Sequence, residues 1–198
     1  MARTSRITFP DLTYHVWANA NSGSSLFRDD DDKNFAIDLL REEVALSGWS
    51  CLAYVLMTTH YHVLLTPRNP TLSRGFGRLN LRYAQYFNKR YELGGHVFAR
   101  RFDSKVVEGP GGRLEVLRYI ARNPIKARMC DYPENYAWSS FGSTLGLFPP
   151  DGITDVAAAL AALNGSPRAL QKYVAEEDPR VRQGQVLACP PSRRRRAA

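Results

Sequence analysis

Two histidines separated by one residue, His60 and His62, are the first candidates for chemistry because their type and spacing suit a metal site. They lie in an apolar run that predicts a strand, and alternate side chains of a strand leave the same face of its sheet. Two imidazoles on one face can bind a single divalent cation. The same pattern is also typical of partly buried, hydrogen-bonded histidines. From the spacing alone, His60 and His62 could therefore be metal ligands or structural histidines.

A tyrosine and an asparagine four residues apart, Tyr119 and Asn123, form a second candidate. They lie at the end of a predicted helix, where this spacing places both side chains on one face, one turn apart. A phenol can attack phosphorus covalently when a cation and nearby donors stabilise the phenolate and the transition state. The amide oxygen of Asn123 could complete a metal site begun by the two histidines. The alternatives are a core tyrosine, and an asparagine that caps a further short helix starting at Pro124.

The elements that must position these residues follow from apolar periodicity and from the places of turn residues. We expect strands over residues 12–18, 49–57, 60–66 and 102–107. We expect helices over residues 29–47, 71–91 and 113–122, with a turn at 109–112 and an interruption at 123–124. This order matches an α+β, ferredoxin-like (RRM-like) sandwich with a mostly antiparallel sheet and helices on one face.

The length of 198 residues suits one domain of ordinary size with a tail. We expect this domain over residues 10–148, a short helical extension over 149–177, and a disordered basic tail over 178–198. Three widely spaced cysteines support neither a disulfide framework nor a CxxC zinc site. No stretch reaches the roughly 18 apolar residues that cross a bilayer. These features favour a cytoplasmic protein with no membrane association.

The net charge of +8 and the pI of about 9.6 indicate a polyanionic partner, because Lys and Arg release counterions condensed on nucleic acid. Residues 68–105 hold nine basic and two acidic side chains, a local net charge of +7. Within this segment we expect phosphate contacts from Arg74, Arg78, Arg82, Lys89, Arg100, Arg101 and Lys105. Its aromatic residues include candidates for stacking on unpaired bases, namely Tyr86, Tyr91, Phe98 and Phe102, although several must belong to the core.

Four blocks of the sequence, in order, resemble the REP-associated tyrosine transposases, which belong to the HUH single-tyrosine transposases. The first is THYHVLLTP at residues 59–67, and the second covers 86–91, 95–98 and 101–105. The third is RYIARNPIKA at 118–127, and the fourth is YAWSS at 136–140. The resemblance covers residues 12–141, about two thirds of the chain. Four ordered blocks are far more specific than a His-x-His pair alone.

The resemblance implies roles for the residues that match the family's motifs. His60 and His62 resemble the HUH metal pair, Asn123 the third metal ligand and Tyr119 the catalytic tyrosine. Tyr61 is a mild variation, since the residue between the histidines is usually bulky and hydrophobic. The implied cofactor is one Mg²⁺ or Mn²⁺, and the implied intermediate is a 5′-phosphotyrosyl bond. The implied partner is single-stranded or hairpin DNA of the repetitive palindromic kind, bound by a nucleoid-associated monomer or homodimer.

Two other functions compete with this one. An RNA-recognition-like module would bind single-stranded nucleic acid on a similar sheet without catalysis, but it would not need the histidine pair, the tyrosine and the asparagine together. A metal-dependent hydrolase would use the same histidines to activate water. Only the tyrosine nuclease leaves protein covalently attached to DNA. We expect the two remaining histidines of the chain, His15 and His96, to pack or to contact nucleic acid and not to bind metal.

Overall fold

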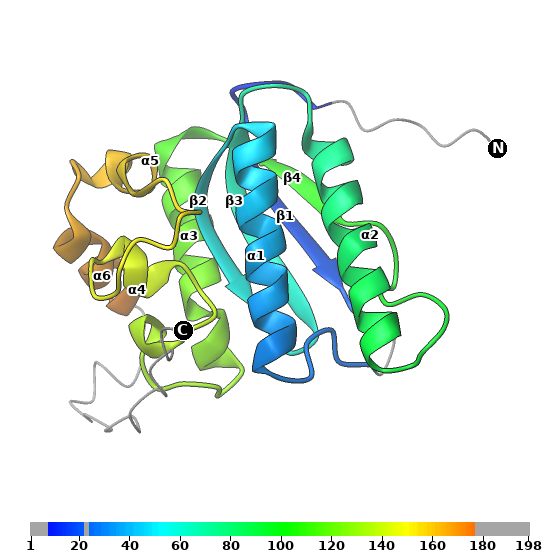
Figure 1. Cartoon of the computed structure of the whole chain (residues 1–198). Coiled ribbons are helices and arrows are strands. Elements are labelled where there is room, and N and C mark those ends of the chain that lie inside the picture. The colour runs from blue at the N-terminus through cyan, green and yellow to red at the C-terminus, as the bar shows by residue number, and fades with distance from the viewer. Residues whose placement is uncertain (1–7, 22–23, 177–198) are drawn as a thin grey trace.

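A four-stranded antiparallel sheet carries the histidine pair on one of its two inner strands. The computed structural model describes residues 8–21 and 24–176, and within these ranges the sheet has the order β2-β3-β1-β4 (Figure 1). Its strands are β1 (Thr13–Asn19), β2 (Trp49–Leu56), β3 (His60–Pro67) and β4 (Asp103–Val107). Strand β1 pairs with both β3 and β4, which sets Trp17 opposite His62 and His15 opposite Lys105.

Two long helices cover one face of the sheet. Helices α1 (Asp30–Ser47) and α2 (Leu72–Arg90) pack against each other and lie in front of the strands in Figure 1. Asp29 begins α1 as its N-cap, because its side chain accepts a hydrogen bond from the backbone N–H of Asp32. Gly48 ends α1 with a φ of 62°, in the left-handed region that favours glycine.

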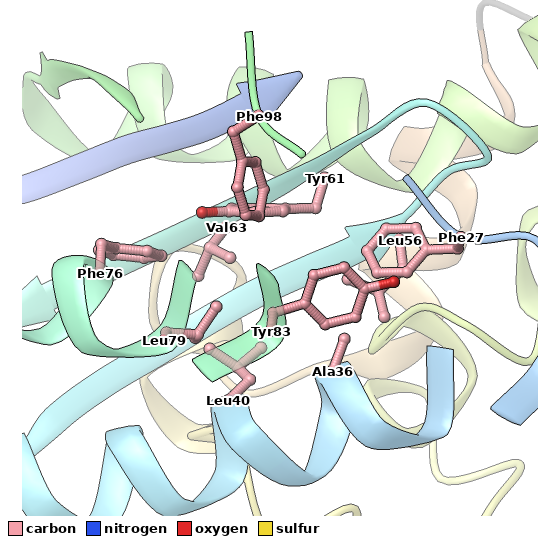
Figure 2. Close-up of a pocket in the computed structure, with 10 residues that line it drawn as sticks. All are labelled: Phe27, Ala36, Leu40, Leu56, Tyr61, Val63, Phe76, Leu79, Tyr83 and Phe98. Atoms are coloured by element: carbon pink, nitrogen blue, oxygen red, sulfur yellow. The ribbon is translucent and has the colours of Figure 1, made fainter. Parts of the chain in front are cut away.

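Aromatic and aliphatic side chains fill the core between these helices and the sheet. Figure 2 shows them pointing toward one another around a cavity of about 20 Å³, lined by Phe27, Ala36, Leu40, Leu56, Tyr61, Val63, Phe76, Leu79, Tyr83 and Phe98. The two phenols among them are satisfied, since Tyr83 donates to the carbonyl of Leu26 and Tyr61 donates to Asn80. An apolar space with room for about one water molecule is a small packing void rather than a ligand site.

A third helix covers the opposite face of the sheet. Helix α3 (Gly109–Lys126) packs there through Leu117, Ile120 and Ala121, against a core that includes Leu64 of β3. The chain after α3 forms η1 (Pro133–Asn135), which contacts α3, and then four short helices that add side chains to the same core: α4 (Phe141–Thr144), α5 (Val156–Leu160), η2 (Ala161–Leu163) and α6 (Pro167–Ala175). In Figure 1, α3 lies behind the strands.

The predicted α+β, ferredoxin-like class with an antiparallel sheet is confirmed, and the predicted strands and two long helices agree with the observed ones to within two residues. The structure differs in one detail, because helices cover both faces of the sheet instead of one. Helix α3 follows the ferredoxin-like unit and carries its own apolar stripe. It buries this stripe on the sheet face that α1 and α2 leave open.

Helix α3 is longer than predicted at both ends. The predicted turn at 109–112 is wrong, since these residues form the first turn of α3. Proline is tolerated at Pro110 because the backbone N–H groups of a first helical turn have no hydrogen-bond partner within the helix. The predicted interruption at 123–124 is also wrong, because both residues lie inside α3. The helix tolerates Pro124 near its end, where the N–H of Ala127 still bonds to the carbonyl of Asn123.

The expected basic tail at 178–198 lies outside the described residues. Residues 149–176 contain α5, η2 and α6, and their apolar side chains join the core beneath α3. In the part of the chain that the structure describes, no helix is both long enough and apolar enough to cross a membrane.

Gly75 allows α2 to approach its neighbours closely. A Cβ at this position would clash with Cζ2 of Trp49 and would lie 2.6 Å from Cη2 of the same ring and 2.7 Å from Oε1 of Glu43. Gly75→Ala should therefore lower the free energy of unfolding by about 1–3 kcal/mol, although alanine is the better helix former. Gly77 in the same helix has open space around it, so Gly77→Ala should raise this free energy by about 0.5–1 kcal/mol. Urea unfolding measures both, and equal stability of the two variants would contradict this packing.

Candidate active site

Four side chains named from the sequence come together on the sheet face that α3 covers. His60 and His62 lie on β3 with their ring centroids 5.0 Å apart. Tyr119 reaches them from α3, and its hydroxyl is 3.4 Å from Nε2 of His62. Asn123 forms a side-chain hydrogen bond with His60, and its Nδ2 donates to the carbonyl of Tyr119 at 3.0 Å. The strand period of two and the helix period of 3.6 residues thus direct all four to one place.

Each imidazole of the pair has its Nδ1 within hydrogen-bonding distance of a neighbouring side chain. Nδ1 of His62 is 3.0 Å from Nε2 of His15, and Nδ1 of His60 is 3.1 Å from Oγ1 of Thr59. Nε2 is then the candidate ligand atom of each ring, because the bond made by one ring nitrogen determines what the other presents.

Burial keeps both imidazoles in the neutral form that metal binding requires. Burial and the nearby His15 and His60 lower the pKa of His62 to about 3. Burial also lowers the pKa of His60, and the hydrogen bond with Asn123 opposes this only in part. At pH 7 both rings therefore offer a lone pair without first losing a proton.

His15 on β1 belongs to the cluster, although its sequence context predicted only packing or nucleic-acid contact. Its ring centroid lies 5.0 Å from that of His62 and 5.8 Å from that of Tyr119. Burial, and to a smaller extent the charge of Lys105, lower the pKa of His15 to about 4. A signal was present in the sequence, because the apolar residues on either side of His15 face the core and so direct it to the other face of β1, beside β3.

The donors at this site fit one divalent cation completed by oxygens from outside the chain. Among the described residues, no group of three or more His, Cys, Asp or Glu side chains is arranged to hold a metal ion. The residues here that could hold a metal are His60 and His62, through their imidazoles, and Asn123, through its amide oxygen. Carbonyl, water and phosphate oxygens suit Mg²⁺ and Mn²⁺, whereas imidazoles are also common ligands of ions such as Zn²⁺, so this donor set fits a divalent cation without selecting one.

Tyr119 is 40% exposed, so a role as a core aromatic does not fit it. It lines an open pocket of about 290 Å³ on α3, together with Glu115, Arg118, Arg122 and Lys126. The ammonium of Lys126 lies 5.3 Å from the centroid of the Tyr119 ring. Arg118, Arg122 and Lys126 were not predicted as site residues from the sequence, although their spacing of four predicts a shared helix face.

The basic residues predicted on α2 lie across the sheet from this site, since α2 packs on the other face. Arg78 donates two hydrogen bonds to the buried carboxylate of Glu43, at 2.7 and 3.1 Å. Arg82 pairs with Glu42 of α1. These two guanidinium groups thus link α2 to α1, and their charge is largely offset within the fold.

The other predicted phosphate contacts are spread over the surface. Arg74, Lys89 and Arg101 are exposed. Arg100 forms an ion pair with Asp103 at 2.7 Å. Lys105 is exposed on β4 opposite His15, so the strand register brings it to the edge of the histidine cluster.

Comparison with solved structures finds the same fold in one transposase. A REP-associated tyrosine transposase bound to a REP hairpin matches with a TM-score of 0.61 and 18% identity, over 79% of this chain and 93% of that one. A putative transposase from Deinococcus radiodurans R1 matches with a TM-score of 0.41 and 21% identity, over 61% and 95% of the two chains. The tRNA(His) guanylyltransferase of Saccharomyces cerevisiae matches with a TM-score of 0.41 and 13% identity, over 88% and 81%.

Sequence comparison assigns the family. No curated protein matches the chain. The family model of the IS200-like transposases matches residues 8–123, which is more than half of the chain and runs from just before β1 to Asn123. The matched segment therefore includes the histidine pair, the exposed tyrosine and the asparagine. On this match, the chain belongs to the family of IS200-like transposases.

Proposed function

We propose that this protein is a metal-dependent, single-tyrosine nuclease and strand transferase that acts on single-stranded or hairpin DNA. The observation that carries the proposal is the position of the Tyr119 hydroxyl, 3.4 Å from Nε2 of His62 and at an open pocket lined by cations. Membership of the IS200-like transposases supports DNA as the partner. The similar fold of a REP-associated transposase bound to a REP hairpin supports a hairpin substrate.

In the proposed reaction the phenol oxygen of Tyr119 bonds to the phosphorus of a scissile phosphodiester as the P–O3′ bond breaks. The phenol loses its proton, and the departing oxygen ends as a free 3′-hydroxyl. The protein then carries the DNA as a 5′-phosphotyrosyl ester. A 3′-hydroxyl of a second DNA end can attack this ester and restore the phenol. Strand transfer therefore requires no ATP, because one phosphodiester is exchanged for another.

The chain's own residues hold the reacting groups in place. The hydrogen bond from Asn123 Nδ2 to the backbone carbonyl of Tyr119 orients the amide of Asn123, whose side chain also bonds to His60. His60, His62 and Asn123 would hold one Mg²⁺ or Mn²⁺. When bound, this ion would supply Lewis-acid polarisation of the scissile phosphate. His15 would hold the ring of His62 in place through the hydrogen bond between its Nε2 and Nδ1 of His62.

The competing functions differ in what they leave behind. A hydrolase that activates water would cut DNA without forming a protein–DNA adduct. A binding module would form neither product nor adduct. Incubation of the protein with single-stranded or hairpin oligonucleotides and Mg²⁺, followed by denaturing electrophoresis, separates the three.

Replacement of Tyr119 by Phe tests the nucleophile. The variant keeps the ring and its contacts but lacks the hydroxyl, so it should fold and bind DNA and metal like the parent yet form no covalent adduct and no nicked strand. Adduct formation on denaturing gels is the measurement, and we expect a loss to below detection. Peptide mapping of the trapped parent complex should place the DNA on Tyr119.

Tyr132→Phe is the matched control. Tyr132 precedes η1 and does not belong to the lining of the pocket, so this variant should retain the adduct. An adduct in the Tyr119→Phe protein, or DNA mapped to another tyrosine, would refute the assignment. Nicked product without an adduct would favour the hydrolase.

His15→Phe tests the support of the metal pair. The phenyl ring preserves the aromatic packing on His62 and Tyr119 but removes the nitrogen that bonds Nδ1 of His62. Loss of such an outer hydrogen bond typically costs about 10–100-fold in metal affinity. We therefore expect the Mn²⁺ dissociation constant, measured by calorimetry without DNA, to rise by about that factor. His60→Ala and His62→Ala should abolish binding.

His96→Phe provides the control, because His96 is exposed in the loop before β4 and should leave Mn²⁺ affinity unchanged. Parent-like Mn²⁺ affinity in the His15→Phe protein would show that His15 only packs. Parent-like affinity in His60→Ala and His62→Ala would place the metal elsewhere.

A further inference from the structure

Trp17 on β1 is an aromatic side chain that belongs to neither core of the described residues. The core between the sheet and helices α1 and α2 does not include it, nor does the core beneath α3. Trp49 is part of the first core, and Trp138 packs against both. Trp17 is half-buried, and its ring centroid lies 5.1 Å from that of His15. Packing in a core therefore does not explain an indole at this position.

The strand register places Trp17 on the sheet face that carries the histidines. Trp17 is the partner of His62 on β3 and of Asp103 on β4, and residues directly opposite on neighbouring strands leave the same face. Helix α3 covers mainly β2 and β3 on this face. The part of β1 that carries Trp17 thus remains half-open beside the histidine pair.

The neighbours of Trp17 on this face are polar. They are His15 and Asn19 on β1, His62 on β3, and Asp103 and Lys105 on β4. Val106, the exposed apolar residue of β4, faces the other side of the sheet, since it lies opposite Tyr14 of the α1–α2 core. A surface that docks a protein usually presents a contiguous apolar patch. One aromatic ring among polar groups instead suits a flat ligand with polar edges, which describes a nucleobase.

The aromatic residues that the sequence offered for base stacking lie on the opposite face of the sheet. Phe102 is buried in the core between the sheet and helices α1 and α2, and Tyr86, Tyr91 and Phe98 pack against that core. These four side chains therefore stabilise the fold. Trp17 is the aromatic residue of the sheet that shares a face with the histidine pair and is not taken up by a core.

His62 connects this indole to the candidate nucleophile. Its Nε2 is 3.4 Å from the hydroxyl of Tyr119. Its strand pairs with that of Trp17, and paired strands lie about 4.8 Å apart. A phosphate at the phenol and a base at the indole would therefore belong to the same nucleotide or to neighbouring ones.

We propose that Trp17 is a stacking subsite for one unpaired base of the strand that Tyr119 attacks. The inference rests on the proposed function for the identity of that strand. It adds a selection that the chemistry alone does not make, because a phenol could attack phosphorus in paired or unpaired DNA. Neighbouring bases cover both faces of a base within a duplex, so a base can stack on the indole only after it has left the duplex. Trp17 thus couples binding at this site to the unpaired state of one nucleotide.

Three probes that share one sugar–phosphate strand but differ in their bases test the subsite. They are a labelled oligothymidylate of about 12 nucleotides, an abasic strand of the same length, and the oligothymidylate paired with the complementary oligoadenylate. Binding is measured by anisotropy in the Tyr119→Phe background, so that cleavage cannot change the probe.

Trp17→Leu in this background should weaken binding of the oligothymidylate about tenfold, within the range for loss of one stacked base. It should leave binding of the abasic strand and of the duplex unchanged, because neither presents the open face of an unpaired base. Trp17→Phe keeps an aromatic ring and should retain most of the affinity for oligothymidylate. Phe9→Leu is the matched control, since Phe9 is an exposed aromatic residue that precedes β1, and it should change none of the three affinities.

Two outcomes would overturn the subsite. One is parent-like affinity of the Trp17→Leu protein for the oligothymidylate. The other is an equal loss of affinity for all three probes, which would indicate a change in packing or charge and not a lost stack. Absence of a covalent adduct in the parent protein would refute the proposed function while these affinities stayed interpretable. A parental adduct together with base-independent binding would refute the subsite alone.

The emission of the indole gives a second measurement that needs no loss of affinity. A base stacked on Trp17 should quench part of the tryptophan emission when oligothymidylate is added to the Tyr119→Phe protein, and the abasic strand should not. Trp17→Phe should remove this quenching, because Trp49 is buried and Trp138 packs against the cores. Quenching that persists without Trp17 would place the bases at another tryptophan and overturn the subsite.

Discussion

Helix α3 docks on the second face of the sheet through Leu117 and Ile120, and this contact creates the candidate active site. The Tyr119 hydroxyl and the His62 ring meet although they are 57 positions apart in sequence. Their meeting depends on the apolar interface between α3 and the sheet. Asn123 and Lys126 lie near Tyr119 on the same helix, so the docking of α3 places all three relative to the sheet. A small rotation of α3 would move all of them together.

Charge in this protein has two uses that sequence alone does not separate. On the α1–α2 face, cations stabilise the fold: Arg78 neutralises the buried Glu43, and Arg90 bonds to Asp32, whose side chain is fully buried. Removal of the cation from a buried carboxylate lowers the stability of the fold by several kcal/mol, so these arginines cannot bind DNA phosphates instead without loss of stability. On the α3 face the cations line a pocket. The net charge of +7 in residues 68–105 therefore overstates what that segment offers to phosphates.

The sequence was sufficient for the parts of the structure that depend on local periodicity. Alternation around His60 and the helical stripe of α2 predicted the strands and long helices to within two residues. The sequence was insufficient where tertiary contacts determine the bounds of a helix. Pro124 lies inside α3 because packing and the hydrogen bond from the N–H of Ala127 to the carbonyl of Asn123 hold the end of the helix. The histidine pair and Tyr119 could be named from motif spacing. His15 could not be connected to them until the pairing of β1 with β3 was known.

The site lies on a strand and a helix instead of on loops, and this has a consequence for its chemistry. Side chains on rigid elements lose little further freedom when substrate binds, so the geometry that the proposed reaction needs would be largely present beforehand. The same burial that makes the scaffold rigid lowers the pKa of His62 to about 3, so that its ring is a ready ligand at neutral pH. Tyr119 is the exception within the cluster, since it is 40% exposed. In the proposed reaction this exposure would let the Tyr119 hydroxyl reach a phosphate of an incoming strand at the edge of the buried histidines.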